Sequence, residues 1–550
     1  MRLAGRNFRL ATRPALGAIV ALVLVGPAVP APVLPAPRLL DLRVGNGSSP
    51  FAGDRPLLTT VSPNGDGFRD RAIVSFRLAE PARVRLDVVS TDSVKRSAPL
   101  AQTIWTKAVK LRRGPHRLVW RPRKDTPDRT YVLRITLTGR GGARRVYGLP
   151  RPGLRARVIA PVVRVLGIEA RFLQPSYAPG DSADVAVATD ARSLRFQVFA
   201  LTKIPHPNEQ DLKTGGEAMT PPVTLDWHGH ADARHLVRVV RAGDWPSGLY
   251  FLRITANDGR VGYAPFILRP RTLGAHRVAV VLSTNTWQAY NFDDANGDGW
   301  GDSWYVSAAL RQIDLRRPYL DFGVPFRFRD WDLNVVSWLS STGKQVDYLS
   351  DDDLARYANG DELARDYDLV VFPGHEEYVT QHAYDVVRRY RDLGGNLLFL
   401  SANNFFWKVV RHGPYLTRVD QWRLLGRPEA SLVGVQFDGG DYGGRQGPYI
   451  VSGATTEPWA FAGTGLANGD RFGTYGFEID KRAPSSPPGT HVLATIPNLM
   501  GPRRSAEMTY YETPRGAKVF AAGALNFAAS TGDPTVARLL ENVWARLSRP

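Results

Sequence analysis

Apolar and polar residues alternate with a period of two along much of the first 270 residues. Clear examples are Arg71–Leu78, Ala82–Val89 and Tyr131–Leu137, in which nearly every second side chain is apolar. This period places the apolar side chains on one face of an extended strand, so each segment predicts a half-buried β-strand. Because the segments are short and are separated by turns rich in Gly, Pro and Asp, they predict β-sandwich domains.

The alternating region divides into two modules, which we expect at 40–158 and 160–272. The segment Tyr250–Thr255 nearly repeats Tyr131–Thr136, as the same strand would in two related sandwiches arranged in tandem. The turn Ser62–Gly67 resembles the start of immunoglobulin-like modules in secreted bacterial proteins. The resemblance implies an immunoglobulin-like fold for these modules.

After the second module, alternation gives way to short continuous apolar runs. Val278–Ser283, Leu369–Phe372 and Leu397–Leu400 predict strands that are buried on both faces. Between the last two, Thr380 is placed to cap a helix whose apolar residues recur at helical spacing. Strand, helix and strand in this order predict a parallel sheet, so we expect an α/β domain at 275–550. Further strands are expected at Leu333–Leu339, Leu432–Phe437, Val492–Ile496, Met508–Glu512 and Val519–Ala522, and a last helix at Val536–Leu547.

The first 36 residues have the pattern of a signal peptide followed by a Pro-rich spacer. Arginines precede the apolar run Ala15–Val25, and small residues and prolines follow it. The run is shorter than the roughly 20 residues that a membrane-spanning helix needs. We therefore expect a secreted or cell-surface protein, attached to a membrane only if this segment is not cleaved.

The chain carries a formal net charge of +19, and most of it lies in one stretch. Residues 54–157 hold 24 Lys and Arg against 8 Asp and Glu, a surplus of 16 positive charges. Such a module can bind nucleic acid, an anionic polymer or a membrane. Because its basic residues form no helical stripe, we expect them to cover exposed strand faces, and we expect no nucleic-acid partner. The chain has no cysteine, which excludes disulfides, thiolate nucleophiles and iron–sulfur clusters.

Polar side chains follow three of the predicted buried strands at the points where those strands end. The segments are Ser283–Asn291, Phe372–Val379 and Ser401–Trp407. In open α/β sheets, ligands bind beyond the carboxyl ends of the strands. Position alone therefore predicts that these three segments meet in one binding site.

Four segments resemble the large (beta) subunit family of N,N-dimethylformamidase: Thr286–Asn291, Gly374–Tyr378, Gly394–Asn403 and Gly523–Phe527. Their order and spacing carry the resemblance over roughly residues 241–550. The resemblance implies a class I glutamine-amidotransferase-like fold and a mononuclear iron held by two tyrosines and a glutamate. It also implies hydrolysis of a small amide to an amine and formate, with a homo-oligomer or a small subunit as partner.

Carried over residue by residue, the resemblance assigns the iron to Tyr250, Tyr290 and Glu377. His375 and Asn403 would line the site, and Glu478 would be an acid or base. Phenolate and carboxylate are hard anionic donors, which suit trivalent iron. Each residue also has a structural alternative. For Tyr250 a purely structural role is a strong alternative, because Tyr131 occupies the same place in the first module, where no site is expected.

An acidic insertion follows the first polar segment. Four of its side chains fit ligand positions of a twelve-residue calcium loop: Asp294, Asn296, Asp298 and Asp302. The twelfth position is Tyr305 rather than a bidentate glutamate, so the insertion is not an EF-hand. The alternatives are a calcium site and a tight Asp/Gly turn.

Two functions from different classes fit these patterns. The first is an exported, dimethylformamidase-like amidohydrolase with a metal-assisted mechanism. The second is a non-catalytic cell-surface or carbohydrate-binding protein that retains the amidotransferase-like fold. The chain has neither the Gly-x-Ser-x-Gly elbow of serine hydrolases nor a phosphate-binding loop.

Overall fold

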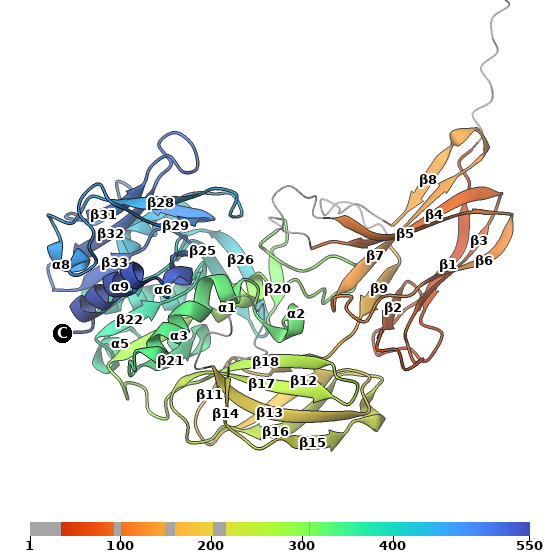
Figure 1. Ribbon diagram of the computed structural model, residues 1–550, viewed down its shortest axis with the longest axis horizontal. Coiled ribbons are helices and arrows are strands. Elements are labelled where there is room, and N and C mark those ends of the chain that lie inside the picture. The colour runs from red at the N-terminus through yellow and green to blue at the C-terminus, as the bar shows by residue number, and fades with distance from the viewer. Residues whose placement is uncertain (1–34, 93–100, 149–159, 202–215, 307–308, 550) are drawn as a thin grey trace, which may run out of the picture.

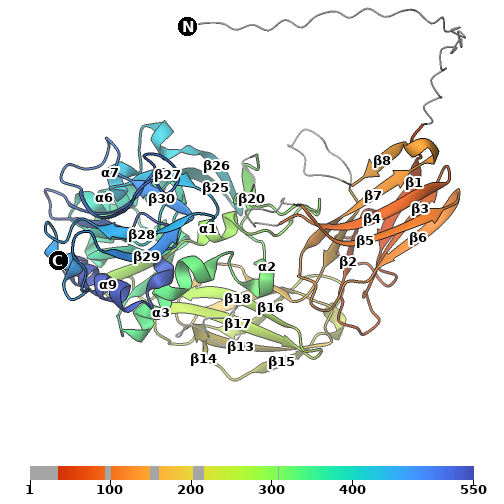
Figure 2. The same ribbon diagram turned by 45° about the horizontal axis from the view of Figure 1, so that its top comes forward.

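The computed structural model describes residues 35–92, 101–148, 160–201, 216–306 and 309–549. The molecule is elongated, with a β-sandwich at one end and an α/β domain at the other (Figure 1). A second β-sandwich lies between them along one side, in contact with the α/β domain (Figures 1 and 2). The predicted signal peptide falls outside the described residues. Within them, no helix is long and apolar enough to cross a membrane.

The first sandwich packs two sheets around apolar side chains such as Val84, Leu86 and Ile135. Its smaller sheet has the order β1(Leu39–Gly45)-β3(Ala72–Leu78)-β6(Gly114–Trp120). The larger has the order β2(Leu58–Val61)-β9(Val162–Val165)-β7(Thr130–Thr138)-β4(Ala82–Ser90)-β5(Gln102–Leu111), and β8(Arg144–Tyr147) pairs with β7 after the turn η1(Arg140–Gly142). Strand β9 was expected to open the second module, but it pairs with β2 and β7, so the first sandwich extends to Val165.

The second sandwich has one sheet in the order β10(Glu169–Phe172)-β12(Ser182–Ala188)-β16(His235–Arg241). The other has the order β11(Ser176–Tyr177)-β18(Val261–Leu268)-β17(Gly248–Ala256)-β13(Ser193–Leu201)-β14(Gly216–Ala218), and β15(Val223–Asp226) pairs with β13 before the turn η2(His228–His230). Leu249, Phe251 and Tyr263 turn away from the sandwich core and join the core of the α/β domain. Shared burial of apolar surface therefore holds these two domains together.

The main sheet of the C-terminal domain is parallel on one side and antiparallel on the other. Its order is β21(Asp347–Ser350)-β19(Val278–Leu282)-β22(Leu369–Phe372)-β24(Asn396–Phe399)-β33(Lys518–Ala521)-β32(Ala506–Glu512)-β31(His491–Ile496)-β28(Gln446–Val451)-β29(Arg471–Gly476). The strands from β21 to β33 run parallel. Alternate residues of β19 enter two different cores, because helices cover both faces of the sheet.

Helices α5(Gly360–Asp366) and α6(Gln381–Asp392) cover one face, and α3(Asn334–Ser341) and α9(Pro534–Leu547) cover the other. The predicted cap of α6 is confirmed, since the Thr380 hydroxyl accepts a hydrogen bond from the Ala383 amide. The apolar run Leu333–Leu339 was expected to be a strand, and this is wrong. Its residues lie mostly in α3, with Val335, Val336 and Trp338 buried, because a short apolar run suits a buried helix as well as a strand.

The run Leu432–Phe437 likewise does not form one strand: it contains the end of α7(Ala430–Val433) and the start of β27(Gln436–Gly440). Strand β27 pairs with β30(Glu478–Lys481), and a side sheet has the order β20(Gln312–Asp314)-β26(Tyr415–Gln421)-β25(Trp407–His412)-β23(Tyr378–Thr380). The remaining elements are α1(Thr284–Ala289), α2(Leu320–Gly323), the π-helical turn η3(Arg329–Leu333), α4(Asp351–Leu354), η4(Trp422–Leu425), α8(Pro458–Phe461) and η5(Phe527–Ser530).

Candidate active site at the strand ends

The three polar segments predicted from the sequence meet at one place in the C-terminal domain. Tyr290 ends helix α1, which follows β19, and the loop that follows β22 carries His375 and Glu377. Asn403 lies in the loop after β24, and Glu478 begins β30, which approaches from the antiparallel side. Tyr290, Glu377 and Asn403 converge because parallel neighbouring strands end at the same edge of the sheet.

Direct hydrogen bonds connect these side chains. The Tyr290 hydroxyl donates a short hydrogen bond to Oε2 of Glu377 and lies 3.1 Å from Nε2 of His375. Nδ2 of Asn403 donates to Oε1 of Glu377 at 3.1 Å and to Oε2 of Glu478 at 2.8 Å. Nε2 of His375 lies 3.4 Å from the Glu377 carboxylate and 3.7 Å from that of Glu478. The residues that the resemblance assigned to the iron site, except Tyr250, therefore form one connected cluster.

The structure places Tyr250 elsewhere, so its assignment as a ligand of the same ion is wrong. Its hydroxyl donates to the Pro246 carbonyl at 2.7 Å, and its ring stacks on Trp245 and Phe266 in the core of the second sandwich. Tyr131 makes the same bond to the Pro127 carbonyl at 2.9 Å in the first sandwich. In both β-sandwiches the tyrosine hydroxyl thus binds backbone four residues upstream, which is the arrangement of a tyrosine corner.

A second tyrosine does reach the cluster, and sequence reasoning did not single it out. Tyr378 follows Glu377 directly, is fully buried, and its ring lies 5.9 Å from that of Tyr290. Burial, the charge of Glu377 and a hydrogen bond to its carboxylate raise the pKa of Tyr378 well above its usual value. Two phenols therefore lie beside one carboxylate. The sequence placed Tyr378 within the predicted site segment Phe372–Val379 but gave it no role of its own.

Burial and mutual charge shift the proton affinities of this cluster. Burial and the charge of Glu377 raise the pKa of Tyr290 well above 10, and burial raises the pKa of Glu478 to about 7. For His375, burial opposes protonation, but the bond to Glu377 and the charge of Glu478 outweigh it and raise its pKa to about 9. Near neutral pH, His375 is a cation and Glu478 exchanges its proton readily.

Asp480 holds Asn403 in place. Asn403 adopts a left-handed backbone with φ 55°, and its backbone N–H donates to both carboxylate oxygens of Asp480, at 2.9 and 2.8 Å. Burial raises the pKa of Asp480 to about 8.

We expect Asp480→Ala to lower kcat by about 10- to 100-fold with KM little changed, because Asn403 loses the hydrogen bonds that hold its side chain in position. Asp480→Asn should restore part of that rate. Equal losses in the two variants, or a loss confined to KM, would contradict the positioning role.

The donor set around Glu377 fits a metal ion by its chemistry. Among the described residues, no group of three or more His, Asp or Glu side chains is arranged to hold a metal, so a site here depends on Tyr290 and Tyr378. Oδ1 of Asn403 is buried and has no hydrogen-bond partner within the described structure. Two phenolates and a carboxylate at this spacing would repel each other unless a cation lay between them.

Aromatic rings enclose the cluster on one side. The ring of Tyr305 lies 5.0 Å from that of Tyr290, and the ring of Trp331 lies 5.4 Å from that of His375. Tyr442, which is 56% exposed, packs against Tyr305 at 5.3 Å. The Glu478 side chain is 21% exposed, whereas that of His375 is 1% exposed. Solvent therefore reaches the cluster at Glu478.

The acidic insertion forms a turn whose carboxylates bind backbone amides. Asp294 accepts from the amides of Gly297, Asp298 and Gly299 at 2.7–3.2 Å, and Asp302 accepts from Ala295 and from the Asn296 side chain. Burial and the negative charges of Asp298 and Asp302 raise the pKa of Asp294 to about 7. Burial raises the pKa of Asp302 to about 6. Calcium at this loop stays a prediction.

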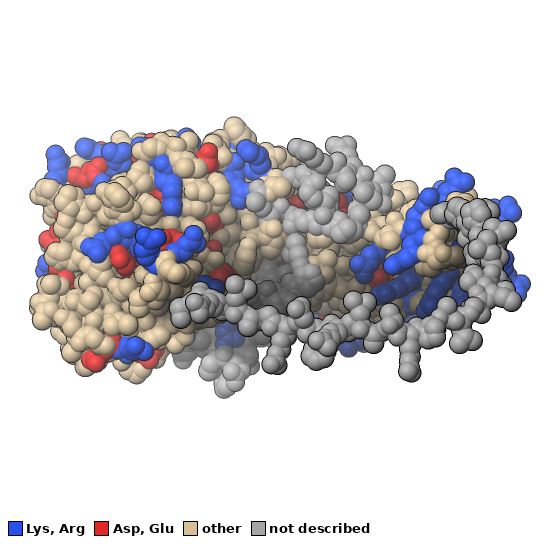
Figure 3. All heavy atoms as spheres, turned by 90° about the horizontal axis from the view of Figure 1, so that it is seen from above, with Lys and Arg blue, Asp and Glu red and all other residues tan. Residues whose placement is uncertain are grey.

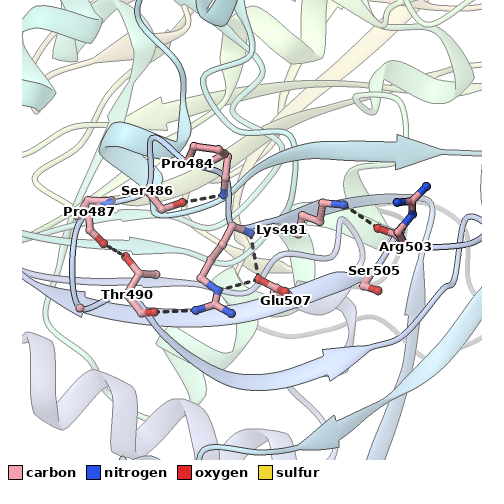
Figure 4. A pocket seen from close by; sticks show the side chains of 11 residues that line it. Lys481, Pro484, Ser486, Pro487, Thr490, Arg503, Ser505 and Glu507 are labelled. Atoms are coloured by element: carbon pink, nitrogen blue, oxygen red, sulfur yellow. Dashed lines mark hydrogen bonds and ion pairs between the residues drawn. The ribbon is translucent and has the colours of Figure 1, made fainter.

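A surface hollow of about 600 Å³ lies in the same domain but contains none of the cluster residues (Figure 4). Lys481, Arg482 and Arg503 line it. Lys481 pairs with Asp438 and Arg482 with Glu507, so two of these three cations already have acidic partners. The hollow is therefore a different part of the surface from the cluster of Tyr290, His375 and Glu377.

Comparison with known proteins identifies the family. Residues 234–536 match the family model described as N,N-dimethylformamidase beta subunit-like, C-terminal. The N,N-dimethylformamidase beta subunit of Paracoccus aminophilus is 24% identical over 407 residues, covering 55% of this chain and 52% of that protein. The subunit of the same name from an Alcaligenes species is 26% identical over 278 residues, covering 38% of this chain and 36% of that protein.

The chain thus spans about half the length, or less, of these relatives. Among solved structures, native E. coli α2-macroglobulin matches 42% of this chain and 16% of its own at 13% identity, with a TM-score of 0.23, too low to indicate a shared fold. The matched family region begins at strand β16 of the second sandwich and contains every residue of the cluster. By this match over more than half its length, the chain belongs to the N,N-dimethylformamidase beta subunit-like family.

Proposed function

We propose that the protein is an amidohydrolase that cleaves the C–N bond of a small linear amide. The observation that carries this proposal is the convergence of Tyr290, Tyr378 and Glu377 beside a buried histidine and a second, partly exposed glutamate. Clusters of ionisable groups with shifted pKa values are typical of catalytic sites. The alternative of a non-catalytic carbohydrate-binding protein gives no reason to bury these groups in contact with each other.

We assign a mononuclear iron to Tyr290, Tyr378 and Glu377. Hard anionic oxygen donors suit trivalent iron, and Tyr378 takes the place that the sequence had given to Tyr250. When bound, such an ion polarises an amide carbonyl and lowers the pKa of a water molecule. The family resemblance supports the metal, and the geometry supports this choice of the second tyrosine.

The other side chains of the cluster orient groups and move protons. Glu478, with its pKa near 7, can accept a proton from water and return it to the departing amine. Nδ2 of Asn403 bridges Glu478 and Glu377 and so fixes the distance between the two carboxylates. The imidazolium of His375 places a positive charge beside both of them.

The proposal includes a class I glutamine-amidotransferase-like fold for the C-terminal domain, supported by its parallel strands with helices on both faces. It also includes export from the cytoplasm, supported by the pattern of the first 36 residues. A small subunit or a second copy of the chain is a further expectation from the family resemblance.

The pH dependence of amide hydrolysis tests these roles. We expect kcat/KM for a short N-alkyl formamide, followed by amine release, to rise through about pH 7 as Glu478 ionises. It should fall through about pH 9 as His375 loses its proton. Glu478→Gln should lower kcat by about 10²- to 10⁴-fold and remove the acid limb. No amine release from any formamide or acetamide, or an unchanged acid limb in the variant, counts against the proposal.

A further inference from the structure

A row of basic side chains crosses the outer face of the larger sheet in the first sandwich. Lys110 of β5 lies directly opposite Arg83 of β4, and Arg83 lies opposite Thr138 of β7. Thr138 in turn lies opposite Arg144 of β8. Lys110, Arg83 and Arg144 are all exposed, and we call them the basic row. With strands about 4.8 Å apart, the row is about 15 Å long.

The basic row carries positive charge that the fold does not neutralise. Further along the same face, Arg85 and Arg134 both pair with Asp87. Among the described residues, no acidic partner is found for Lys110, Arg83 or Arg144. Like charges directly opposite each other on neighbouring strands destabilise a sheet. Lys and Arg side chains gather over this end of the molecule, with few acidic side chains among them (Figure 3).

The same face is turned toward the C-terminal domain (Figures 1 and 2). Trp300, from the acidic insertion, packs on Val89 and Val132 at the other end of the face. The Thr91 hydroxyl and the Arg55 guanidinium bind carbonyls of that insertion. One end of the face is thus covered by the α/β domain, and the basic row is left open beside it.

We propose that the basic row binds an acidic polysaccharide, a linear chain of sugars that carry carboxylate, sulfate or phosphate groups. Cations about 5 and 10 Å apart in a straight line match a linear polymer with repeated negative charges. Thr138 lies between Arg83 and Arg144 in the row, and its hydroxyl group suits sugar hydroxyls. The outward positions next to the row are Arg85 of β4, Ala108 of β5, Thr136 of β7 and Val146 of β8.

The row and these neighbouring positions include no aromatic ring, so this part of the face has no platform on which unpaired bases could stack. A flat sheet face also does not enter a duplex groove. The C-terminal domain beside the row restricts the approach of a bilayer, whereas a flexible polymer can pass alongside it. An acidic polysaccharide is therefore favoured over a nucleic acid or a membrane surface.

Binding of the full chain to immobilised polygalacturonate, eluted with a salt gradient, tests this proposal. We expect retention that weakens steeply with salt, because polymer counterions are released on binding. Arg83→Ala/Lys110→Ala/Arg144→Ala should bind at least about tenfold more weakly and show a shallower salt dependence. Its Tm should be equal to or above that of the wild type, since the variant removes like-charge repulsion.

A matched control replaces three exposed arginines elsewhere, Arg195, Arg388 and Arg515, by alanine and removes the same total charge. This control should bind polygalacturonate like the wild type. Equal loss of binding in both triple variants would show that net charge alone is responsible and would overturn the proposal. Retention of the wild type by duplex DNA or by anionic phospholipid vesicles, with none by polygalacturonate, would also overturn it.

Discussion

Glu377→Gln should lower amide hydrolysis by about 10³-fold or more while the protein stays folded. Glu377 is the residue on which the cluster converges, since Tyr290 and Asn403 hydrogen-bond its carboxylate and Tyr378 packs against Tyr290 beside it. Glutamine keeps the size of the side chain but removes the negative charge. The measurement is kcat/KM for a formamide substrate, together with a thermal melt.

The neighbouring glutamate is the matched control. Glu376 is equally buried, but burial and the charge of Asp351 raise its pKa well above the usual value, which favours its neutral form. Glutamine resembles that neutral form, and Glu376→Gln should therefore keep activity within a few-fold and keep the Tm. If Glu376→Gln were inactive and Glu377→Gln active, the assignment of the two adjacent glutamates would be reversed.

Tyr378→Phe should abolish most activity, by about 10²-fold or more, whereas Tyr250→Phe should leave activity nearly unchanged. Removing the Tyr378 hydroxyl takes one oxygen from beside Glu377. Removing the Tyr250 hydroxyl breaks its bond to the Pro246 carbonyl in the sandwich and should cost about 0.5–1.5 kcal/mol of unfolding free energy.

Kinetics and urea unfolding of the two phenylalanine variants separate these effects. The expected pattern is an inactive but stable Tyr378→Phe and an active but less stable Tyr250→Phe. Tyr131→Phe, which removes the equivalent bond in the first sandwich, should behave like Tyr250→Phe. Inactivity of Tyr250→Phe in a folded protein would return that residue to the active site.

The parts of the site that the sequence predicted are those set by the parallel sheet. Strands β22 and β24 are continuous apolar runs, so their ends are visible in the sequence, and the polar residues that follow them meet at one edge. The cap of α6 at Thr380 was equally readable, since a threonine directly before a helical apolar pattern is typical of an N-cap.

The parts that were missed depend on packing between distant segments. Tyr250 shares its local sequence pattern with Tyr131, and the same residues serve a tyrosine corner, so pattern alone could not exclude a structural role. Successive side chains of an extended segment point to opposite sides. The sequence therefore predicts that the Tyr378 side chain points away from Glu377, whereas the structure brings the two together. Asp480 reaches Asn403 from β30, a strand in which the resemblance had assigned a role only to Glu478.

Iron content per chain in the purified wild type, Tyr378→Phe and Tyr250→Phe proteins tests the central claim most directly. We expect about one iron per chain in the wild type and in Tyr250→Phe, and a large loss in Tyr378→Phe, because a metal site loses affinity when one of its few protein ligands is removed. Wild-type protein without iron, or loss of iron in Tyr250→Phe alone, would contradict the assignment of Tyr290, Tyr378 and Glu377 as the metal site.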